Sequence, residues 1–160
     1  MPLIRLTIPG TLDYRDLAVR VVAAACKLVR QNDENGENGE NKENNGVSEE
    51  ARSEFDMHVV SAFGEAFNNV AIHSYKGRPV GSLDIEIDVG VGEITLRIAD
   101  HGPGYDPLDV KEPDLDELPE SGMGLFIMRE FMDSVSYQAG APNVLSMSKK
   151  LSEQTSGGVA

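Results

Sequence analysis

The chain of 160 residues is long enough to bury one hydrophobic core, and it carries 27 acidic against 14 basic residues, a formal net charge of −13. This balance argues against non-specific binding to DNA or RNA, whose phosphates attract basic proteins. Cys26 is the only cysteine, which excludes a disulfide framework and a thiolate metal site, and no apolar run is long enough to span a bilayer, so we expect a soluble, cytoplasmic protein.

The first third of the chain is expected to form a strand, a helix and a long polar connection. Alternating apolar residues in "LIRLTI", followed by Pro-Gly, predict the strand. Thr11 is placed to cap a largely buried helix over residues 12–30, in which Cys26 suits a small apolar site. Residues 31–50 are rich in Asn, Glu and Gly and have almost nothing to bury, which predicts a solvated insert; a functional tether is the alternative.

A second helix is predicted from Glu54 to about Tyr75, and it carries two different stripes. At about 100° per residue, the apolar side chains share one arc that predicts the core-facing side, namely Val59, Val60, Phe63, Phe67 and Val70. Glu65, Asn69 and His73 follow one another at intervals of four and form a polar stripe bordered by small alanines. A functional surface and a plain solvated face with i,i+4 pairs both explain this stripe.

Apolar and polar residues alternate over residues 83–89 and 93–98, which predicts an antiparallel hairpin with one solvent-exposed face. Its second strand ends in Asp100, and Gly102 and Gly104 follow, which permit the close approach of another backbone or a ligand; a tight loop is the alternative. Residues 101–121 are expected to form a loop, residues 124–133 a helix, and residues 135–138 and 144–151 two further strands.

Together these elements predict an α/β fold, a two-layer sandwich of a mixed, mostly antiparallel sheet with helices on one face. Residues 1–151 are expected to form a single domain, interrupted by the acidic low-complexity insert at about 31–50. Residues 152–160 are expected to form a disordered tail.

The order and spacing of three motifs resemble the Bergerat-fold (GHKL) ATPases. The motifs are Glu-x-x-x-Asn on a helix, a hairpin that ends in Asp-x-Gly-x-Gly, and Gly-x-Gly at the start of a later helix. Within that superfamily, "EAFNNVAIHSY", "DHGPGYD" and "SGMGLFIMREFMD" are most similar to the bacterial anti-sigma-factor serine kinases. The resemblance covers residues 55–151 and implies the Bergerat ATPase fold.

The resemblance also implies a role for each motif in binding ATP or ADP with Mg²⁺. Asp100 would accept the exocyclic amine of adenine, Asn69 would bind Mg²⁺, and Glu65 would act as the general base. The other nucleotide-binding positions that the motifs imply are Gly102, Gly104, Ser121, Gly122, Met123 and Gly124. Residues 105–121 would form a lid over the triphosphate, and His73 would have a packing role near the site.

The family resemblance implies a cytoplasmic bacterial anti-sigma factor that phosphorylates a STAS-type antagonist protein on serine. It also implies a homodimer, without direct contact to nucleic acid or membrane. Two departures favour the alternative of a catalytically weak ATP-binding regulatory module: the lid has Lys111 among many acids, and Asn143 and Ser146 stand where a Gly-Thr usually touches phosphate. A regulatory ATPase with a partner outside sigma-factor control is a third reading.

Overall fold

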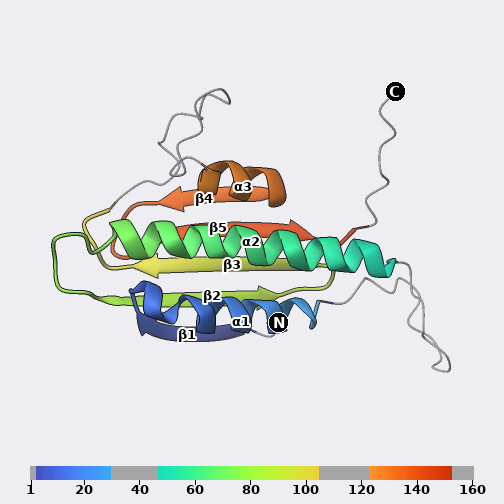
Figure 1. Cartoon of the computed structure of the whole chain (residues 1–160), viewed down its shortest axis with the longest axis horizontal. Coiled ribbons are helices and arrows are strands. Elements are labelled where there is room, and N and C mark those ends of the chain that lie inside the picture. Colours follow the sequence, from blue (N-terminus) through green and yellow to red (C-terminus); the bar gives the residue numbers. More distant parts are fainter. Residues whose placement is uncertain (1–2, 30–46, 105–122, 153–160) are drawn as a thin grey trace.

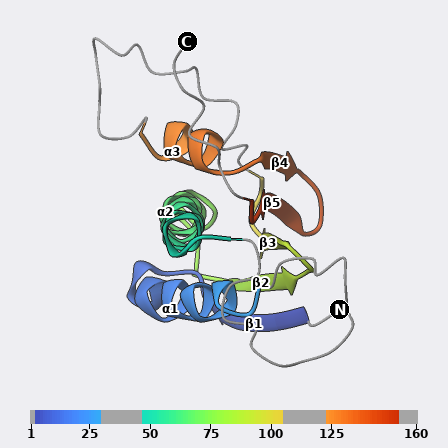
Figure 2. The ribbon, with the colours of Figure 1, turned by 90° about the vertical axis from the view of Figure 1, so that its right-hand side faces the viewer.

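A five-stranded sheet and a layer of three helices make up the part of the chain that the computed structural model describes, residues 3–29, 47–104 and 123–152. The helices cover one face of the sheet (Figures 1 and 2). The elements are β1 (Leu3–Pro9), α1 (Arg15–Cys26), α2 (Glu49–His73), β2 (Ser82–Val89), β3 (Glu93–Asp100), α3 (Met123–Phe131), β4 (Ser134–Gln138) and β5 (Asn143–Lys150). The predicted α/β two-layer sandwich is therefore confirmed.

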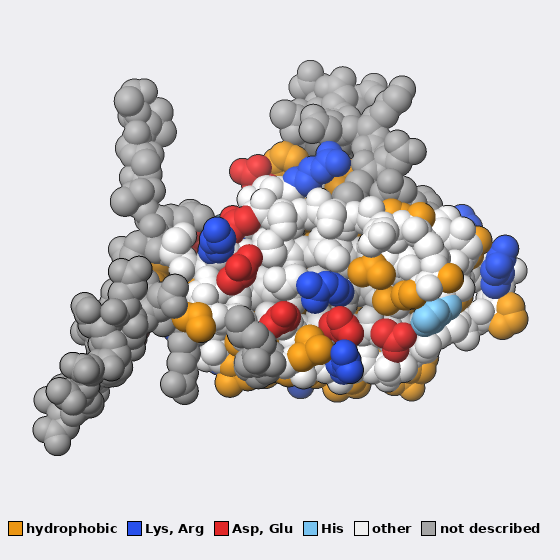
Figure 3. All heavy atoms as spheres, turned by 180° about the vertical axis from the view of Figure 1, so that it is seen from behind, with side chains coloured by type: hydrophobic (Ala, Val, Ile, Leu, Met, Phe, Trp, Pro, Cys, Tyr) orange, Lys and Arg blue, Asp and Glu red, His pale blue; other side chains and the backbone are white. Residues whose placement is uncertain are grey.

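The strand order is β1-β2-β3-β5-β4, and every pair among these strands is antiparallel. The prediction of a mixed sheet thus differs from the described sheet, which contains no parallel pair. The predicted hairpin is the pair β2–β3, in which Ile85 lies opposite Ile98. Inward residues of both strands are buried, as the alternation predicted, while Asp84 and Arg97 face the uncovered side. Figure 3 shows that side, where acidic and basic side chains are mixed with scattered apolar ones.

The helix α2 lies over the middle of the sheet, along the direction of the strands, and buries most of the predicted apolar arc (Figure 1). Phe63 and Phe67 are fully buried, whereas Val60 is only half-buried. The helix begins at Glu49, five residues before the predicted start. The earlier start has a physical cause, because the Ser48 hydroxyl accepts a hydrogen bond from the Ala51 amide at 3.1 Å and two glutamates occupy the first turn, where the helix dipole favours negative charge.

Two predictions about the first helix are wrong. The segment divides into a short 3₁₀ helix at Leu12–Tyr14 and α1, and α1 buries only one face because it lies at the edge of the helix layer (Figure 2). Leu17 on its outer side is 48% exposed. The Thr11 side chain does not cap the turn, and its hydroxyl has no hydrogen-bond partner among the described residues. Cys26 is buried as expected, and burial, with nearby Asp56 adding, raises the pKa of its thiol to about 12.

The C-terminal end of α3 is fastened to the sheet and to α2. Lys149 of β5 is 6% exposed, and its Nζ donates to the Phe131 carbonyl oxygen at 2.6 Å. The His58 ring of α2 stacks on the Phe131 ring with centroids 4.3 Å apart. Burial is the main cause that lowers the pKa of His58, and the nearby positive charge of Lys149 lowers it further, so this ring stays uncharged at neutral pH.

In the described residues, no helix is both long and apolar enough to cross a membrane.

Tyr75 joins the end of α2 to the start of β2 and to the segment that follows β3. Its hydroxyl donates to the Ser82 carbonyl oxygen at 2.7 Å and accepts from the His101 amide at 3.0 Å. Its ring packs against Gly10 and Gly81, where a Cβ would lie only 2.9 and 2.6 Å from ring atoms. The glycines therefore make room for the aromatic ring.

We predict that Tyr75→Phe lowers the free energy of unfolding by about 1–3 kcal/mol, because a buried carbonyl and an amide each lose their partner. Urea denaturation followed by circular dichroism measures the loss. Tyr14→Phe is the matched control, because Tyr14 is 39% exposed and its replacement should change stability by less than about 0.5 kcal/mol. Equal stability of the Tyr75→Phe variant and the wild-type protein would contradict this assignment.

Candidate functional site

The start of α3 lies directly against the polar stripe of α2. A Cβ placed on Gly124 would be 2.9 Å from Glu65 Oε2 and 3.5 Å from Asn69 Nδ2. A Cβ at position 124 would require the Glu65 carboxylate to shift, whereas it would make an ordinary contact with Asn69. Glu65 and Asn69 are half-buried, so they stay accessible while the alanines beside them, Ala62 and Ala66, are fully buried. The structure thus brings together three of the residues that the motifs single out.

Asp100, the last residue of β3, is 4% exposed and is held by one of its two carboxylate oxygens. Asp100 Oδ1 accepts a hydrogen bond from the Gly102 amide at 2.9 Å and another from Asn143 Nδ2 at 3.1 Å. No hydrogen bond to Oδ2 is found among the described residues, and a carboxylate oxygen is an acceptor only. The site therefore offers an acceptor with a fixed direction, which suits an amino group.

Gly102 and Gly104 are glycines for different reasons. A Cβ on Gly102 would lie 2.2 Å from the Ser74 carbonyl oxygen, so the chain after β3 touches the end of α2 backbone to backbone. Gly104 has a φ of +93°, a conformation that side chains with a Cβ rarely adopt. The close approach that the sequence indicated is thus made with the protein's own backbone at Gly102.

The two histidines near the site differ in environment. His73, on the polar stripe, is half-buried, and burial, with Lys76 adding, lowers its pKa, so the ring is neutral at pH 7. His101 is exposed, and its Nε2 lies 3.1 Å from Asp84 Oδ2 on the outer side of the sheet. Hydrogen bonds from Thr7 and then His101 lower the pKa of Asp84. These contacts connect His101, in the loop after Asp100, to β2 and β1 on the uncovered side of the sheet.

Some of the predicted site lies outside the described residues. Ser121, Gly122 and the expected lid at 105–121, with Lys111, belong to this part, as does most of the insert at 31–50. Met123 and Gly124 are described and open α3, where Met123 is half-buried and Gly124 is buried.

Asn143 is the residue whose role the sequence did not indicate. It is 2% exposed, and its side-chain amide donates hydrogen bonds to Asp100 and to the Gly102 carbonyl oxygen in the loop after β3. Ser146 lies on the uncovered side of the sheet, since its neighbours Leu145 and Met147 point inward and are buried. The cross-strand pairing of Asp100 with Asn143 is the signal that would have found Asn143, and it requires the strand register.

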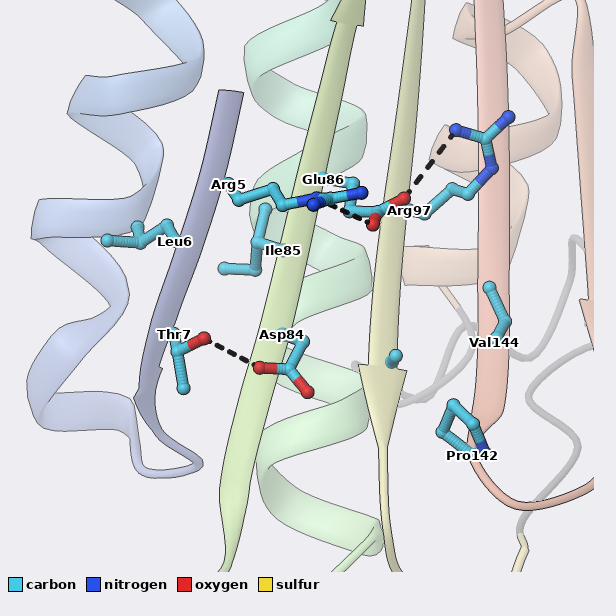
Figure 4. Close-up of a pocket in the computed structure, with 10 residues that line it drawn as sticks. Arg5, Leu6, Thr7, Asp84, Ile85, Glu86, Arg97, Pro142 and Val144 are labelled. Carbon is cyan, nitrogen blue, oxygen red and sulfur yellow. Dashed lines mark hydrogen bonds and ion pairs between the residues drawn. The ribbon is translucent and has the colours of Figure 1, made fainter. Parts of the chain in front are cut away.

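A hollow of about 300 Å³ lies on the other side of the sheet and is separate from this site (Figure 4). The Glu86 carboxylate lies between two guanidinium groups that line the hollow, 3.2 Å from Arg5 and 4.0 Å from Arg97.

In the described part of the chain, no group of three His, Cys, Asp or Glu side chains is arranged to hold a metal ion.

Known proteins resemble this chain over about half of its length. An Anti-sigma F factor from Clostridium botulinum (strain Eklund 17B / Type B) is 37% identical over 84 residues, which cover 48% of this chain and 57% of that protein. The Serine-protein kinase RsbW of Bacillus licheniformis is 30% identical over 101 residues, covering 58% of this chain and 63% of that protein. The matches thus span less than two thirds of these relatives.

Among solved structures, the histidine kinase domain of a blue-light activated histidine kinase from Erythrobacter litoralis EL346 matches 61% of this chain and 45% of its own chain, with 17% identity and a TM-score of 0.46. The family model described as the histidine kinase-like ATPase domain matches residues 16–149, which include α2, the hairpin, α3 and nearly all of β5. The chain therefore belongs to the family of histidine kinase-like ATPase domains.

Proposed function

We propose that this chain binds ATP together with Mg²⁺, sequesters a sigma factor and phosphorylates a serine of a STAS-type antagonist protein. The family membership supports nucleotide binding, and the relatives named Anti-sigma F factor and Serine-protein kinase RsbW support the two activities. We also propose action in the bacterial cytoplasm, with a homodimer as the working assembly.

The observation that carries the proposal is the placement of two groups along one helix. Gly124 lies against Glu65 and Asn69, and Gly102 lies against Ser74, nine positions after Glu65 and five after Asn69. At 1.5 Å per residue, Ser74 is about 14 Å from Glu65 and about 8 Å from Asn69 along the helix axis. Such a separation suits an elongated ligand with an amine at one end and phosphates at the other, which matches ATP.

The residues present fit the chemistry of such a ligand. Asp100 Oδ2 is positioned to accept the adenine amine, and the first amides of α3 can donate to phosphate oxygens. Asn69 supplies an amide oxygen, a ligand type that Mg²⁺ prefers, and the ion would neutralise phosphate charge. Glu65, one turn away, would take the proton of the attacking serine hydroxyl while the serine oxygen bonds to the γ-phosphorus and ADP leaves.

A second candidate function is an ATP-binding regulatory module with weak turnover. It is favoured by Asn143, whose amide is fully engaged by Asp100, Gly102 and Gly140 instead of facing phosphate. Incubating the full chain with labelled ATP, Mg²⁺ and candidate antagonist proteins separates the two functions. Transfer of label to the antagonist supports the kinase, binding without transfer supports the module, and release of free phosphate alone points to a regulatory ATPase.

Asp100→Asn is expected to weaken ATP binding about ten- to hundredfold while the fold is retained. Since the oxygen at the Oδ1 position must still accept from two donors, the new amide nitrogen takes the Oδ2 position and meets the adenine amine donor to donor. Calorimetric titration with ATP measures the change. Asp16→Asn, on the exposed side of α1, is the matched control and should leave the affinity unchanged. Unchanged affinity in Asp100→Asn would remove the adenine assignment.

Glu65→Gln and Asn69→Ala are expected to separate chemistry from binding. If Glu65 acts only as the general base, Glu65→Gln keeps the affinity for Mg²⁺-ATP while serine phosphorylation falls by about 10²–10⁴-fold. Asn69→Ala should weaken Mg²⁺-dependent binding as well as transfer, because the metal loses an oxygen ligand. Calorimetry and a single-turnover transfer assay measure the two effects.

Asn68→Ala serves as the control for the Asn69 change, since it removes the same group from the neighbouring position of α2. Asn68→Ala should alter neither the affinity for Mg²⁺-ATP nor the rate of serine phosphorylation. Transfer at the wild-type rate by Glu65→Gln would end the general-base assignment, and wild-type affinity in Asn69→Ala would end the metal assignment.

A further inference from the structure

The Asn143 side chain uses both ends of its amide in hydrogen bonds. Nδ2 donates to Asp100 Oδ1 at 3.1 Å and to the Gly102 carbonyl oxygen at 3.0 Å, and Oδ1 accepts from the Gly140 amide at 3.0 Å. A reversed amide would face the Gly140 N–H with a donor and the Gly102 carbonyl with an acceptor. The network therefore permits a single orientation of this buried side chain.

This orientation determines how Asp100 is presented. Two donors, the Gly102 amide and Asn143 Nδ2, converge on Oδ1 from two different segments of the chain. Rotation of the carboxylate about its Cβ–Cγ bond would break both bonds. Oδ2 is thereby left in one fixed direction as an acceptor, beside the loop in which Gly104 approaches Asn143 Oδ1.

Strand pairing alone does not require these side-chain bonds. The backbone register already places Asp100 opposite Asn143, in a ladder that extends from Glu93 paired with Lys150. A small or β-branched residue at position 143 would continue this ladder. The side-chain amide thus adds a constraint on the carboxylate beyond what the sheet needs.

We propose that Asn143 is a positioning residue that sets the base preference of the site, because it holds Asp100 with Oδ2 directed at the amino group of adenine. The inference rests on the proposed binding of ATP. A site built to bond an amine discriminates against a purine that lacks it, because a buried acceptor is then left without a partner. A carboxylate that can turn away loses this discrimination.

The test compares Asn143→Val with Asn143→Thr in the full chain. Val and Thr have the same shape and suit a strand, but only Thr keeps a donor for Asp100. Each protein is titrated with ATP and with purine riboside triphosphate, which differs from ATP by the missing amine, in the presence of Mg²⁺. Ser146→Ala, on the uncovered side of the same strand, is the control.

The wild-type protein, Asn143→Thr and Ser146→Ala are expected to bind ATP about ten- to hundredfold more tightly than the analogue. In Asn143→Val the affinity for ATP falls towards that for the analogue, and the affinity for the analogue stays the same. Asn143→Ala removes the same amide with a smaller side chain and gives the same comparison if the Val variant does not fold.

If Asn143 has a purely structural role, Asn143→Val lowers the affinity for both ligands equally and keeps the ratio of the two affinities. That result would overturn the inference. The proposed function can fail separately. If the wild-type protein binds neither ligand, or binds both equally, the proposal of an adenine-reading site is itself wrong. If Asp100→Asn removes the preference and Asn143→Val keeps it, only the role of Asn143 is rejected.

Discussion

The packing of α2 against the inner face of the sheet is the constraint on which the arrangement of the site depends. Phe63 and Phe67 are fully buried, and a shift of one residue, about 100° of rotation, would move them out of the core. The hydrophobic core therefore determines the rotation of the helix about its axis. With that rotation fixed, Glu65 and Asn69 face the start of α3, and the last turn of the helix meets the loop that follows β3.

A second constraint is the register between β3 and β5. A slip of one residue in an antiparallel pair moves every side chain to the opposite face, so the burial of Leu96, Ile98, Leu145 and Met147 specifies the pairing. The same register places Asn143 beside Asp100. Apolar packing in the adjoining part of the same strand pair thus aligns the two polar side chains to within hydrogen-bond distance.

Local patterns predicted the parts of the fold that depend on local periodicity. The alternation in β2 and β3 predicted which residues are buried, and the Glu-x-x-x-Asn spacing predicted that Glu65 and Asn69 share a face. The exposure of Leu17 in α1 was not predicted, because burial there depends on which neighbours the helix has. The hydrogen bond of Asn143 to Asp100 was also not predicted, since Asp100 lies 43 residues earlier in the chain and is brought beside Asn143 only by the sheet.

The anchoring of α3 at its C-terminal end has a mechanical consequence. Phe131 is held by Lys149 and His58, while Gly124 sits near the opposite end of the helix, against Glu65 and Asn69. Seven positions separate Gly124 from Phe131, about 10 Å along the helix axis. A tilt of only about 10° about Phe131 would move Gly124 by about 2 Å relative to Glu65 and Asn69, so the contacts of Phe131 and the buried Leu125 and Met128 together fix the start of α3 against α2.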